Sequence, residues 1–400
     1  MNRPLLELAD IVAVAAHRFT DHPPAWFTWL HLKVLGAIER CRTAAMGGHL
    51  DQCSGCGHRA ISYNSCRNRH CPKCQSQARD RWLEARRAEL LPTPYAHVVF
   101  TLPHQLAALA LQNKDVVYGL LFRTSAQTLI EIASDPTHLG AEIGFFSVLH
   151  TWNQKLQHHP HVHCVVAAGG LARDHTDWVH PRSPRFFLPK DVLSEVFRGK
   201  FLEALKQAHA SGQLRFHGML QGWSHPRLFR SLIRQLRSLH WVVYCKPPFG
   251  APEQVLRYLG AYTHRVAISN RRLVSFQDDQ VTLRWRDSAH KNKKRLLRLP
   301  ADEFLRRFLL HVLPRGFVRI RHFGFLASRR RGPLLALAKQ VLSTSTSGKI
   351  AQATATCSRL PEKPSPLWSC PLCGGSMILI ERLTALQIRL RSPPSSCPRC

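Results

Sequence analysis

Two pairs of closely spaced cysteines near the N-terminus constrain the fold of this chain more than any other feature of the sequence. The pairs are separated by fourteen residues and consist of Cys53, Cys56, Cys71 and Cys74. Two CxxC pairs at this spacing supply the four sulfurs of a tetrahedral structural zinc site, so we expect a zinc ribbon here. Four nearby side chains are alternatives for the fourth ligand: His49, His58, Cys66 and His70.

A second set of cysteines closes the chain and consists of Cys370, Cys373, Cys397 and Cys400. The 23 residues between its two pairs suit a short hairpin, and we expect a second structural zinc site. At the N-terminus, residues 5–19 predict an amphipathic helix rather than a secretion signal, because acidic residues interrupt the apolar run. The 13 cysteines should therefore stay reduced and bind metal rather than form disulfides.

The charge balance narrows the class of partner. The chain carries 56 Lys and Arg against 25 Asp and Glu, a formal net charge of +31. Such a surplus suits a polyanionic partner, and nucleic acid is the usual one. No apolar run reaches the roughly 18 residues of a membrane span, so we expect no membrane partner and a cytoplasmic, nucleoid-associated protein.

Hydrophobic periodicity predicts strands and helices in an order compatible with an α+β fold. Strands are expected at residues 95–103, 143–154, 161–171, 272–277 and 281–287, with helices at 77–91 and 191–212. The expected organisation is an N-terminal helical and zinc-binding domain (1–90), a central domain (91–340), a linker (341–366) and a C-terminal zinc-binding segment (367–400).

Two histidines in the central domain suggest a second kind of metal site. His161 and His163 are two residues apart, so they lie on the same face of a strand. If residues 155–160 form a hairpin loop, Gln154 on the preceding strand can present its amide oxygen to the same point. Three such ligands leave positions open for water or a phosphate oxygen, as in a catalytic metal site. A His-x-His pattern alone is more often a packing or surface pair.

Two tyrosines follow about a hundred residues later. Tyr258 and Tyr262 are four residues apart and share one face of the helix that Pro252 would begin. A buried aromatic stripe has the same spacing. The basic residues around them favour phosphate contact instead: Arg257, His264, Arg265, Arg271 and Arg272.

Three motifs in this order resemble those of HUH-type single-strand endonucleases: "FTLPH" (100–104), "HPHVH" (159–163) and "YLGAYTHRVAISNRRL" (258–273). The closest resemblance is to the two-tyrosine rolling-circle transposases of the insertion sequence 91 family. The stretches "SCRNRHCPKCQ" (65–75) and "LPADEFLRRFLLHVLPRGFVRIRHFGFLA" (299–327) resemble the same family, the first of them its N-terminal zinc-binding domain.

The resemblance implies roles for these residues. Tyr258 and Tyr262 would be nucleophiles that form a 5′-phosphotyrosine, and His161 and His163 would bind Mg²⁺ or Mn²⁺. Gln154 is the expected third ligand, with three competitors: His104, His158 and His159. The implied fold is an antiparallel sheet with helices on one face.

The expected partners are single-stranded DNA and the ends of an insertion sequence. The chain has no G-x-x-x-x-G-K-[ST] motif, so host replication and helicase proteins would displace the strand. We expect the zinc ribbon and the basic tracts 286–298 and 321–332 to contact DNA ends. Alternatives are a plasmid replication initiator or relaxase, and a non-catalytic zinc-ribbon DNA-binding regulator.

Overall fold

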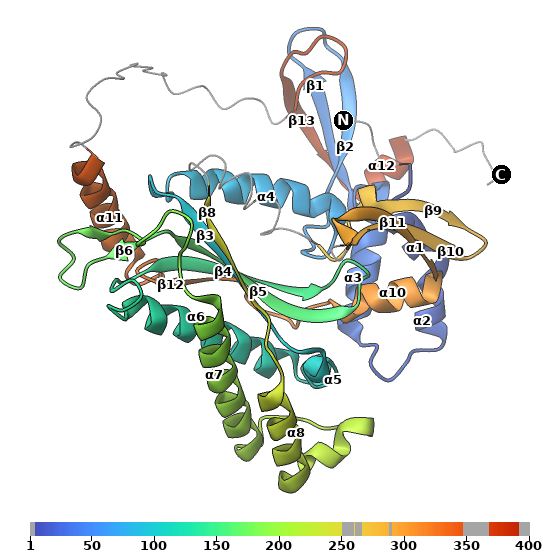
Figure 1. Ribbon diagram of the computed structural model, residues 1–400. Helices are drawn as coiled ribbons and strands as arrows, with labels where there is room; N and C mark the ends of the chain where they lie inside the picture. The colour runs from blue at the N-terminus through green and yellow to red at the C-terminus, as the bar shows by residue number, and fades with distance from the viewer. Residues whose placement is uncertain (1–4, 250–259, 261–265, 288–289, 347–367, 392–400) are drawn as a thin grey trace.

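The computed structural model describes residues 5–249, 260, 266–287, 290–346 and 368–391 (Figure 1). In this part of the chain an antiparallel five-stranded sheet has the order β12-β4-β5-β3-β8. Its strands are β3 (Tyr95–Thr101), β4 (Gly144–Trp152), β5 (His158–Ala167), β8 (Val243–Phe249) and β12 (Ile320–Gly324). The predicted α+β class is confirmed, and β8 and β12 are strands that the periodicity did not predict.

One face of this sheet carries the main hydrophobic core. Alternate strand residues such as Phe100, Val162 and Val166 are fully buried there, as the period of two requires. The covering helices are α5 (Ala107–Gln112), α6 (Lys114–Ser134), α7 (Lys190–Ala210) and α8 (Pro226–Ser238). Figure 1 shows α6 and α7 on this side of the sheet and α4 (Pro72–Arg87) on the other.

The opposite face is covered in part by α4 and by α11 (Arg331–Thr346). Trp82 of α4 meets Phe146 of β4 edge to face, with ring centroids 5.6 Å apart. Since α11 runs to Thr346, residues 341–346 of the linker expected at 341–366 are helical, and the rest of that range lies outside the described residues. Val341 and Leu342 lie in the core of this face, and that burial keeps the last turns helical.

The N-terminal helices do not bury their apolar faces alone. Three helices lie near the N-terminus: α1 (Leu8–Ala15), α2 (His17–Asp21) and α3 (Trp29–Glu39). They share a hydrophobic core with residues far along the chain, so the predicted domain boundary at residue 90 does not separate them from the rest of the protein. Arg18 fastens the two parts through ion pairs to Asp279 (2.8 Å) and Asp302 (2.9 Å). The distant elements are β9 (Leu273–Gln277), β10 (Gln280–Asp287), β11 (Lys293–Pro300) and α10 (Ala301–Leu310).

A separate three-stranded sheet brings together segments near the two ends of the chain. It has the order β13-β1-β2, with β1 (Gly48–Cys53), β2 (Arg59–Tyr63) and β13 (Met377–Leu383). The hairpin expected within residues 374–396 is wrong, because β13 pairs with β1 from Gly48↔Leu383 to Cys53↔Met377 and α12 (Ala385–Arg391) follows it. Pairing with β1 satisfies backbone groups that β13 would otherwise leave open.

Short elements complete the described chain. They are η1 (Ala44–Met46), η2 (His104–Leu106), β6 (Gly170–Leu171), β7 (Trp178–Val179), η3 (Gly218–Ser224) and η4 (Asn270–Arg272). Within the described residues, the helices lack the combination of length and apolar character that crossing a membrane requires.

Candidate metal centres

Three imidazoles meet on the α4-side face of the central sheet. In the antiparallel pair β4–β5, His150 lies opposite His161, and Val148 lies opposite His163. One ring nitrogen from each of His150, His161 and His163 lies within 4.8 Å of the others. His150 and His163 are buried and His161 is half-buried, so the cluster is preorganised by the strands and open on one side.

Hydrogen bonds to the ring nitrogens orient two of these histidines. Nδ1 of His161 lies 2.7 Å from the carbonyl oxygen of His159, which can only accept, so Nδ1 carries the proton and Nε2 is the acceptor nitrogen of the neutral ring. Nδ1 of His163 lies 2.8 Å from Nε2 of His97. Burial lowers the pKa of His97 to about 3, so its neutral ring can accept from His163. Such contacts are typical of histidines that bind metal.

Gln154, the expected third ligand, is not opposite His161. It lies in the β4–β5 turn, beyond the end of β4 at Trp152. His150 occupies the position that was assigned to Gln154. The reason is the hairpin register: the turn spans residues 153–157, and an irregularity after His150 shifts the pairing by one residue.

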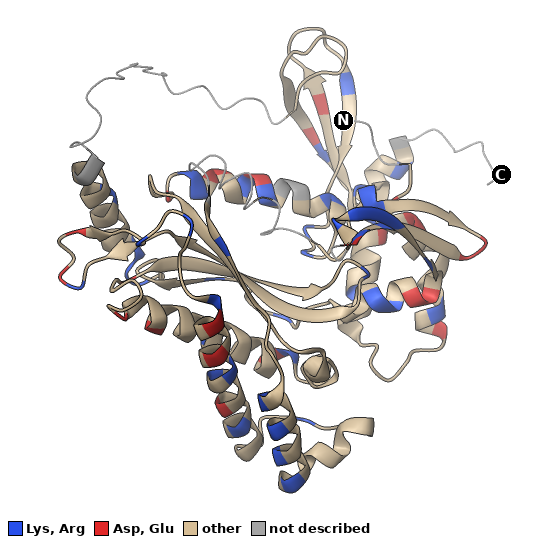
Figure 2. Cartoon of the chain, in the orientation of Figure 1, with Lys and Arg blue, Asp and Glu red and all other residues tan. Residues whose placement is uncertain are grey.

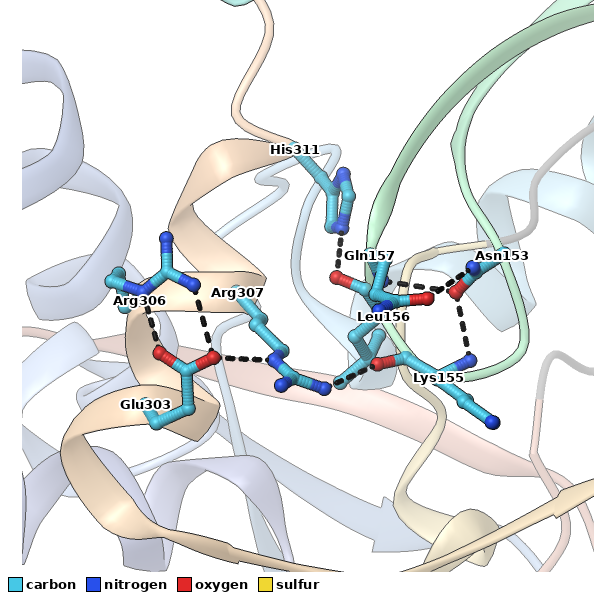
Figure 3. Close-up of polar contacts among 8 residues, drawn as sticks. All are labelled: Asn153, Lys155, Leu156, Gln157, Glu303, Arg306, Arg307 and His311. Atoms are coloured by element: carbon cyan, nitrogen blue, oxygen red, sulfur yellow. Dashed lines mark hydrogen bonds and ion pairs between the residues drawn. The ribbon is translucent and has the colours of Figure 1, made fainter. Parts of the chain in front are cut away.

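Contacts from α10 hold the turn in this register (Figure 3). Arg307 donates to the carbonyl of Lys155 at 3.1 Å, and Nε2 of His311 lies 3.0 Å from the carbonyl of Leu156. Glu303 fixes the Arg307 guanidinium through a 2.6 Å ion pair. Inside the turn, the side-chain oxygen of Asn153 accepts from the backbone of Lys155 (2.9 Å). These groups thereby place His150 opposite His161, and sequence analysis missed all of them.

The other candidate histidines do not join the cluster. His158 points to the helical side, where its Nε2 lies 2.7 Å from the Tyr118 hydroxyl and burial lowers its pKa to about 2. His159 lies beside the cluster, with its ring centroid 5.3 Å from that of His161. His104 is exposed at the start of η2. His150 had a detectable signal, since it precedes His161 and His163 on an adjacent predicted strand.

Both candidate tyrosines, Tyr258 and Tyr262, lie outside the described residues, as do Arg257, His264 and Arg265. Gly260, between the tyrosines in sequence, is described and buried. A Cβ placed on it would lie 2.9 Å from the Leu83 side chain and 3.4 Å from that of Arg79. Gly260 therefore packs closely on α4, the helix that covers part of the histidine face.

The two described arginines of the predicted DNA-binding set differ. Arg271 is exposed. Arg272 donates to the carbonyls of Arg284 (2.9 Å), Ala267 (3.4 Å) and Gln154, and so ties η4 to β10 and to the histidine hairpin. Its guanidinium is engaged in holding the fold, and we assign it a structural role rather than the predicted DNA contact.

The predicted basic tracts also differ. In 286–298, β11 presents exposed Lys293, Lys294 and Arg298, and Figure 2 shows this charge beside α1–α3. In 321–332, Arg330 forms an ion pair with Glu142 (2.6 Å) and Arg331 with Glu89 (3.6 Å). The first tract keeps a surface suited to a polyanion, whereas much of the second is used internally.

One cysteine cluster lies at the N-terminal end of α4. Its members are Cys41, Cys66, Cys71 and Cys74, whose sulfurs lie within 4.8 Å of one another. The Sγ atom of Cys74 is 3.5 Å from those of Cys41 and Cys66. These separations are close to the about 3.8 Å of a zinc tetrahedron with 2.3 Å zinc–sulfur bonds. Hydrogen bonds from Cys66 and Cys71 lower the pKa of the Cys74 thiol.

The other cluster joins the two ends of the chain through Cys53, Cys56, Cys370 and Cys373. Cys53 lies 3.4 Å from Cys373, and Cys56 lies 3.6 Å from Cys370, measured between sulfurs. Backbone N–H groups point at the sulfurs, as in zinc knuckles: Gly55 to Cys53 (3.3 Å) and Gly375 to Cys373 (3.4 Å). Hydrogen bonds from the backbone of Cys56 and Gly55 lower the pKa of Cys53 to about 6.

The expected grouping of the cysteines is therefore wrong. Cys53 and Cys56 do not share a cluster with Cys71 and Cys74, and Cys370 and Cys373 complete the first pair instead. The physical reason is the β1–β13 pairing, which brings Cys53 opposite Met377 and the two CxxC turns together. Cys41 was missed, and Cys66, weighed only as an alternative, is a cluster member. Cys397 and Cys400 lie outside the described residues.

Comparison with known proteins gives two family matches. Residues 12–102 match a family described as "Transposase zinc-binding domain", and residues 144–332 match one described as "Putative transposase". The first range contains the whole cluster at α4 but not Cys370 or Cys373, and the second contains His150, His161 and His163. The cysteine cluster at α4 and the imidazole cluster therefore each lie within one of the matched ranges.

Two relatives span nearly the whole chain. The "Putative transposase y4qJ" of Sinorhizobium fredii (strain NBRC 101917 / NGR234) is 54% identical over 87% of this chain and 88% of its own length. The "Transposase for insertion sequence element IS801" of Pseudomonas savastanoi pv. phaseolicola is 29% identical over 90% and 88%, respectively. No solved structure matches the chain.

Proposed function

This chain belongs to the insertion sequence 91 family of transposases, and we propose that it drives rolling-circle transposition by nicking and rejoining single-stranded DNA through a 5′-phosphotyrosine. A transposase cuts and rejoins DNA strands, so the chain is a DNA strand-transfer enzyme. The proposed mechanism rests chiefly on the imidazole cluster His150, His161 and His163, which lies inside the range that matches the transposase family.

The donor set of this cluster fits a divalent metal. Three imidazoles supply three ligands, and the half-exposed His161 leaves one side of the site open for water and phosphate oxygen. A bound Mg²⁺ or Mn²⁺ would withdraw charge from the scissile phosphate. The protein's own part is orientation: contacts to the His159 carbonyl and to the His97 ring fix the rings of His161 and His163.

The strand transfer itself is assigned to Tyr258 and Tyr262. The phenol oxygen of one tyrosine forms a bond to phosphorus, the bond to the 3′-oxygen breaks, and that oxygen leaves with a proton as a free hydroxyl. Attack by a 3′-hydroxyl on the phosphotyrosine reverses the step, so the phosphodiester bond energy is kept. Two tyrosines allow two successive cleavages, one at each end of the element.

The remaining parts bind DNA and hold the fold. We assign one structural Zn²⁺ to each cysteine cluster. DNA ends would contact the exposed residues Arg271, Lys293 and Lys294, together with Arg257, His264 and Arg265. Because the sequence lacks a nucleotide-binding loop motif, host replication and helicase proteins would displace the strand, in the cytoplasm at the nucleoid.

Covalent trapping tests the proposal. The protein is incubated with single-stranded oligonucleotides of the element ends and Mg²⁺ or Mn²⁺, and a denaturing gel is used to detect a protein–DNA band. We expect this band in the wild type and its loss in the double variant Tyr258→Phe, Tyr262→Phe. His150→Ala should lower its yield at least about 100-fold, since a metal ligand is removed.

Matched variants make the result specific. Gln154→Ala should retain cleavage, because Gln154 lies in the turn and not at the imidazole cluster. His311→Ala is unsuitable as a control, because His311 supports the hairpin. Binding to all end sequences without any adduct would contradict the enzymatic proposal and would favour a non-catalytic DNA-binding regulator.

A further inference from the structure

A groove of about 610 Å³ lies between α7 and α8, two of the helices that cover the main hydrophobic core. Lys206 of α7 and Ile233 of α8 line it in part. The rest of the lining is four exposed arginines of α8, here called the arginine stripe: Arg227, Arg230, Arg234 and Arg237. Figure 2 shows basic residues along the length of α8. The groove therefore concentrates positive charge in a segment that neither of the predicted basic tracts includes.

The arginine stripe follows from the periodicity of α8. Spacings of three, four and three residues place its side chains on one face of the helix. Phe229, Leu232 and Leu236 lie on another face and are buried in the main core, so the stripe points away from that core. Amphipathic helices bind membranes through their apolar face, and α8 has already buried this face against protein.

Helix stability does not explain the arginine stripe. Arginines three or four residues apart repel one another, and Arg227 lies in the first turn, where the helix dipole disfavours positive charge. Within the described residues, the four guanidinium groups form no ion pair and no hydrogen bond. Glu203 of α7 pairs instead with Lys206 of its own helix at 2.6 Å. The charge of the stripe is therefore available to an anion from outside the chain.

The dimensions of the arginine stripe suit a nucleic-acid backbone. At a rise of about 1.5 Å per residue, Arg227 and Arg237 lie about 15 Å apart along the helix. One DNA strand carries a phosphate about every 3.4 Å along its axis, so the stripe spans about four phosphates. Guanidinium groups bind phosphate oxygens in bidentate geometry.

The composition of the groove favours duplex DNA over a single strand. Sites for single strands stack the bases on aromatic side chains, and the described lining of the groove includes none. A duplex keeps its bases inside and presents phosphates on its outside, so a lining of guanidinium groups is sufficient to hold it.

We propose that the arginine stripe binds the phosphate backbone of duplex DNA, without base selection and on the other side of the central sheet from the imidazole cluster. The helix α8 belongs to the layer on the main core, whereas His150, His161 and His163 lie on the α4-side face. The assignment rests on the proposed function, since an element that is moved lies within duplex DNA.

Salt-dependent binding tests the contact. Affinity for a short duplex of arbitrary sequence is measured by fluorescence anisotropy at several salt concentrations, without divalent metal. The stripe variant Arg230→Gln, Arg234→Gln should lower the affinity about 10-fold and the slope of log affinity against log salt by about 2, because two phosphate contacts are lost. Gln matches Arg in helix propensity and removes the charge. Arg230→Lys, Arg234→Lys keeps both charges and should restore most of the slope.

A matched control removes the same charge elsewhere. Arg173→Gln, Arg185→Gln changes two exposed arginines in the loops on either side of β7, and should change duplex affinity less than about 2-fold. Equal losses in the stripe variant and in this control would reduce the effect to net charge and overturn the proposal. An unchanged affinity in the stripe variant would also overturn it.

A measurement on the wild type does not depend on the folding of any variant. Phenylglyoxal modifies arginine side chains, and mass spectrometry locates the modified residues. Duplex DNA should protect the arginine stripe and leave Arg173 and Arg185 reactive. Stripe arginines that react equally with and without duplex would overturn the proposal.

Two other polyanions are outcomes of the same comparison. A single strand of the same length should lose less affinity than the duplex in the stripe variant, and an equal or larger loss would assign the groove to single strands. Co-sedimentation with vesicles of phosphatidylcholine and phosphatidylserine should be the same in the wild type and the stripe variant. A loss confined to the vesicles would assign the groove to a membrane surface. Either result would overturn the assignment to duplex DNA.

The two proposals fail separately. A chain that forms the covalent adduct, and whose stripe variant binds duplex as the wild type does, would keep the tyrosine mechanism and remove the role of the stripe. A chain that forms no adduct, and whose stripe variant loses duplex binding, would keep the stripe as a DNA-binding surface and remove the tyrosine mechanism.

Discussion

The two cysteine clusters have the same ligand chemistry and opposite places in the fold. The cluster at α4 is mostly buried and draws its members from residues 41–74, next to the N-terminal core. The cluster of Cys53, Cys56, Cys370 and Cys373 is half-exposed, and it joins sulfurs that are up to 320 residues apart. The first stabilises a local unit, and the second fastens the far end of the chain to β1.

The difference shows that ligands far apart in the sequence can form a metal site almost as readily as ligands close together. Loop-closure entropy rises only with the logarithm of loop length, so closing 314 residues costs about 2 kcal/mol more than closing 33. Structural zinc contributes about 10–16 kcal/mol, far above that difference. A C-terminal segment can therefore complete an N-terminal site whenever strand pairing directs it there.

The largest effect should come from the cluster at α4. Cys74→Ser should remove one zinc per chain and destabilise the fold by at least about 5 kcal/mol, since this cluster adjoins the N-terminal core. Zinc content by atomic absorption and denaturant unfolding measure the change. Cys245→Ser, at a cysteine outside both clusters, is the control and should keep two zinc ions per chain.

A smaller and more local loss of stability should follow at the cluster of Cys53, Cys56, Cys370 and Cys373. Cys373→Ser should also remove one zinc, yet leave the central sheet folded and expose residues 368–391 to protease. Limited proteolysis with mass spectrometry locates the cuts. If Cys373→Ser instead unfolds the whole chain as Cys74→Ser does, the two clusters are equivalent and the comparison fails.

The smallest effect tests whether contacts other than zinc hold the C-terminal segment. The Trp368 indole donates to Asp51 on β1 at 3.2 Å. Trp368→Phe should keep both zinc ions and lower the protection of β13 from hydrogen exchange by about 1 kcal/mol, the net value of one hydrogen bond. A loss of zinc in this variant would show that Trp368 is needed to assemble the cluster.

Sequence analysis located the paired metal ligands better than the residues that complete each cluster. CxxC pairs and a His-x-His strand indicate metal ligands because their spacing fixes local geometry, and each such described pair lies in a cluster. His150 was missed because its position opposite His161 depends on a turn held by Arg307 of α10 and by His311 directly after that helix. The predicted tyrosine pair and the pair Cys397 and Cys400 lie outside the described residues and stay predictions.

The sequence by itself determined the ligand types, the net charge, the alternating strands and the resemblance to the transposase family, because these depend on residue identity and short-range spacing. Only the tertiary structure decided which ligands meet: β13 beside β1 brings Cys370 and Cys373 to Cys53 and Cys56, and the β4–β5 register brings His150 to His161. The physical reason is that strand register and long-range pairing are set by the combined packing of distant segments, and no local spacing encodes them.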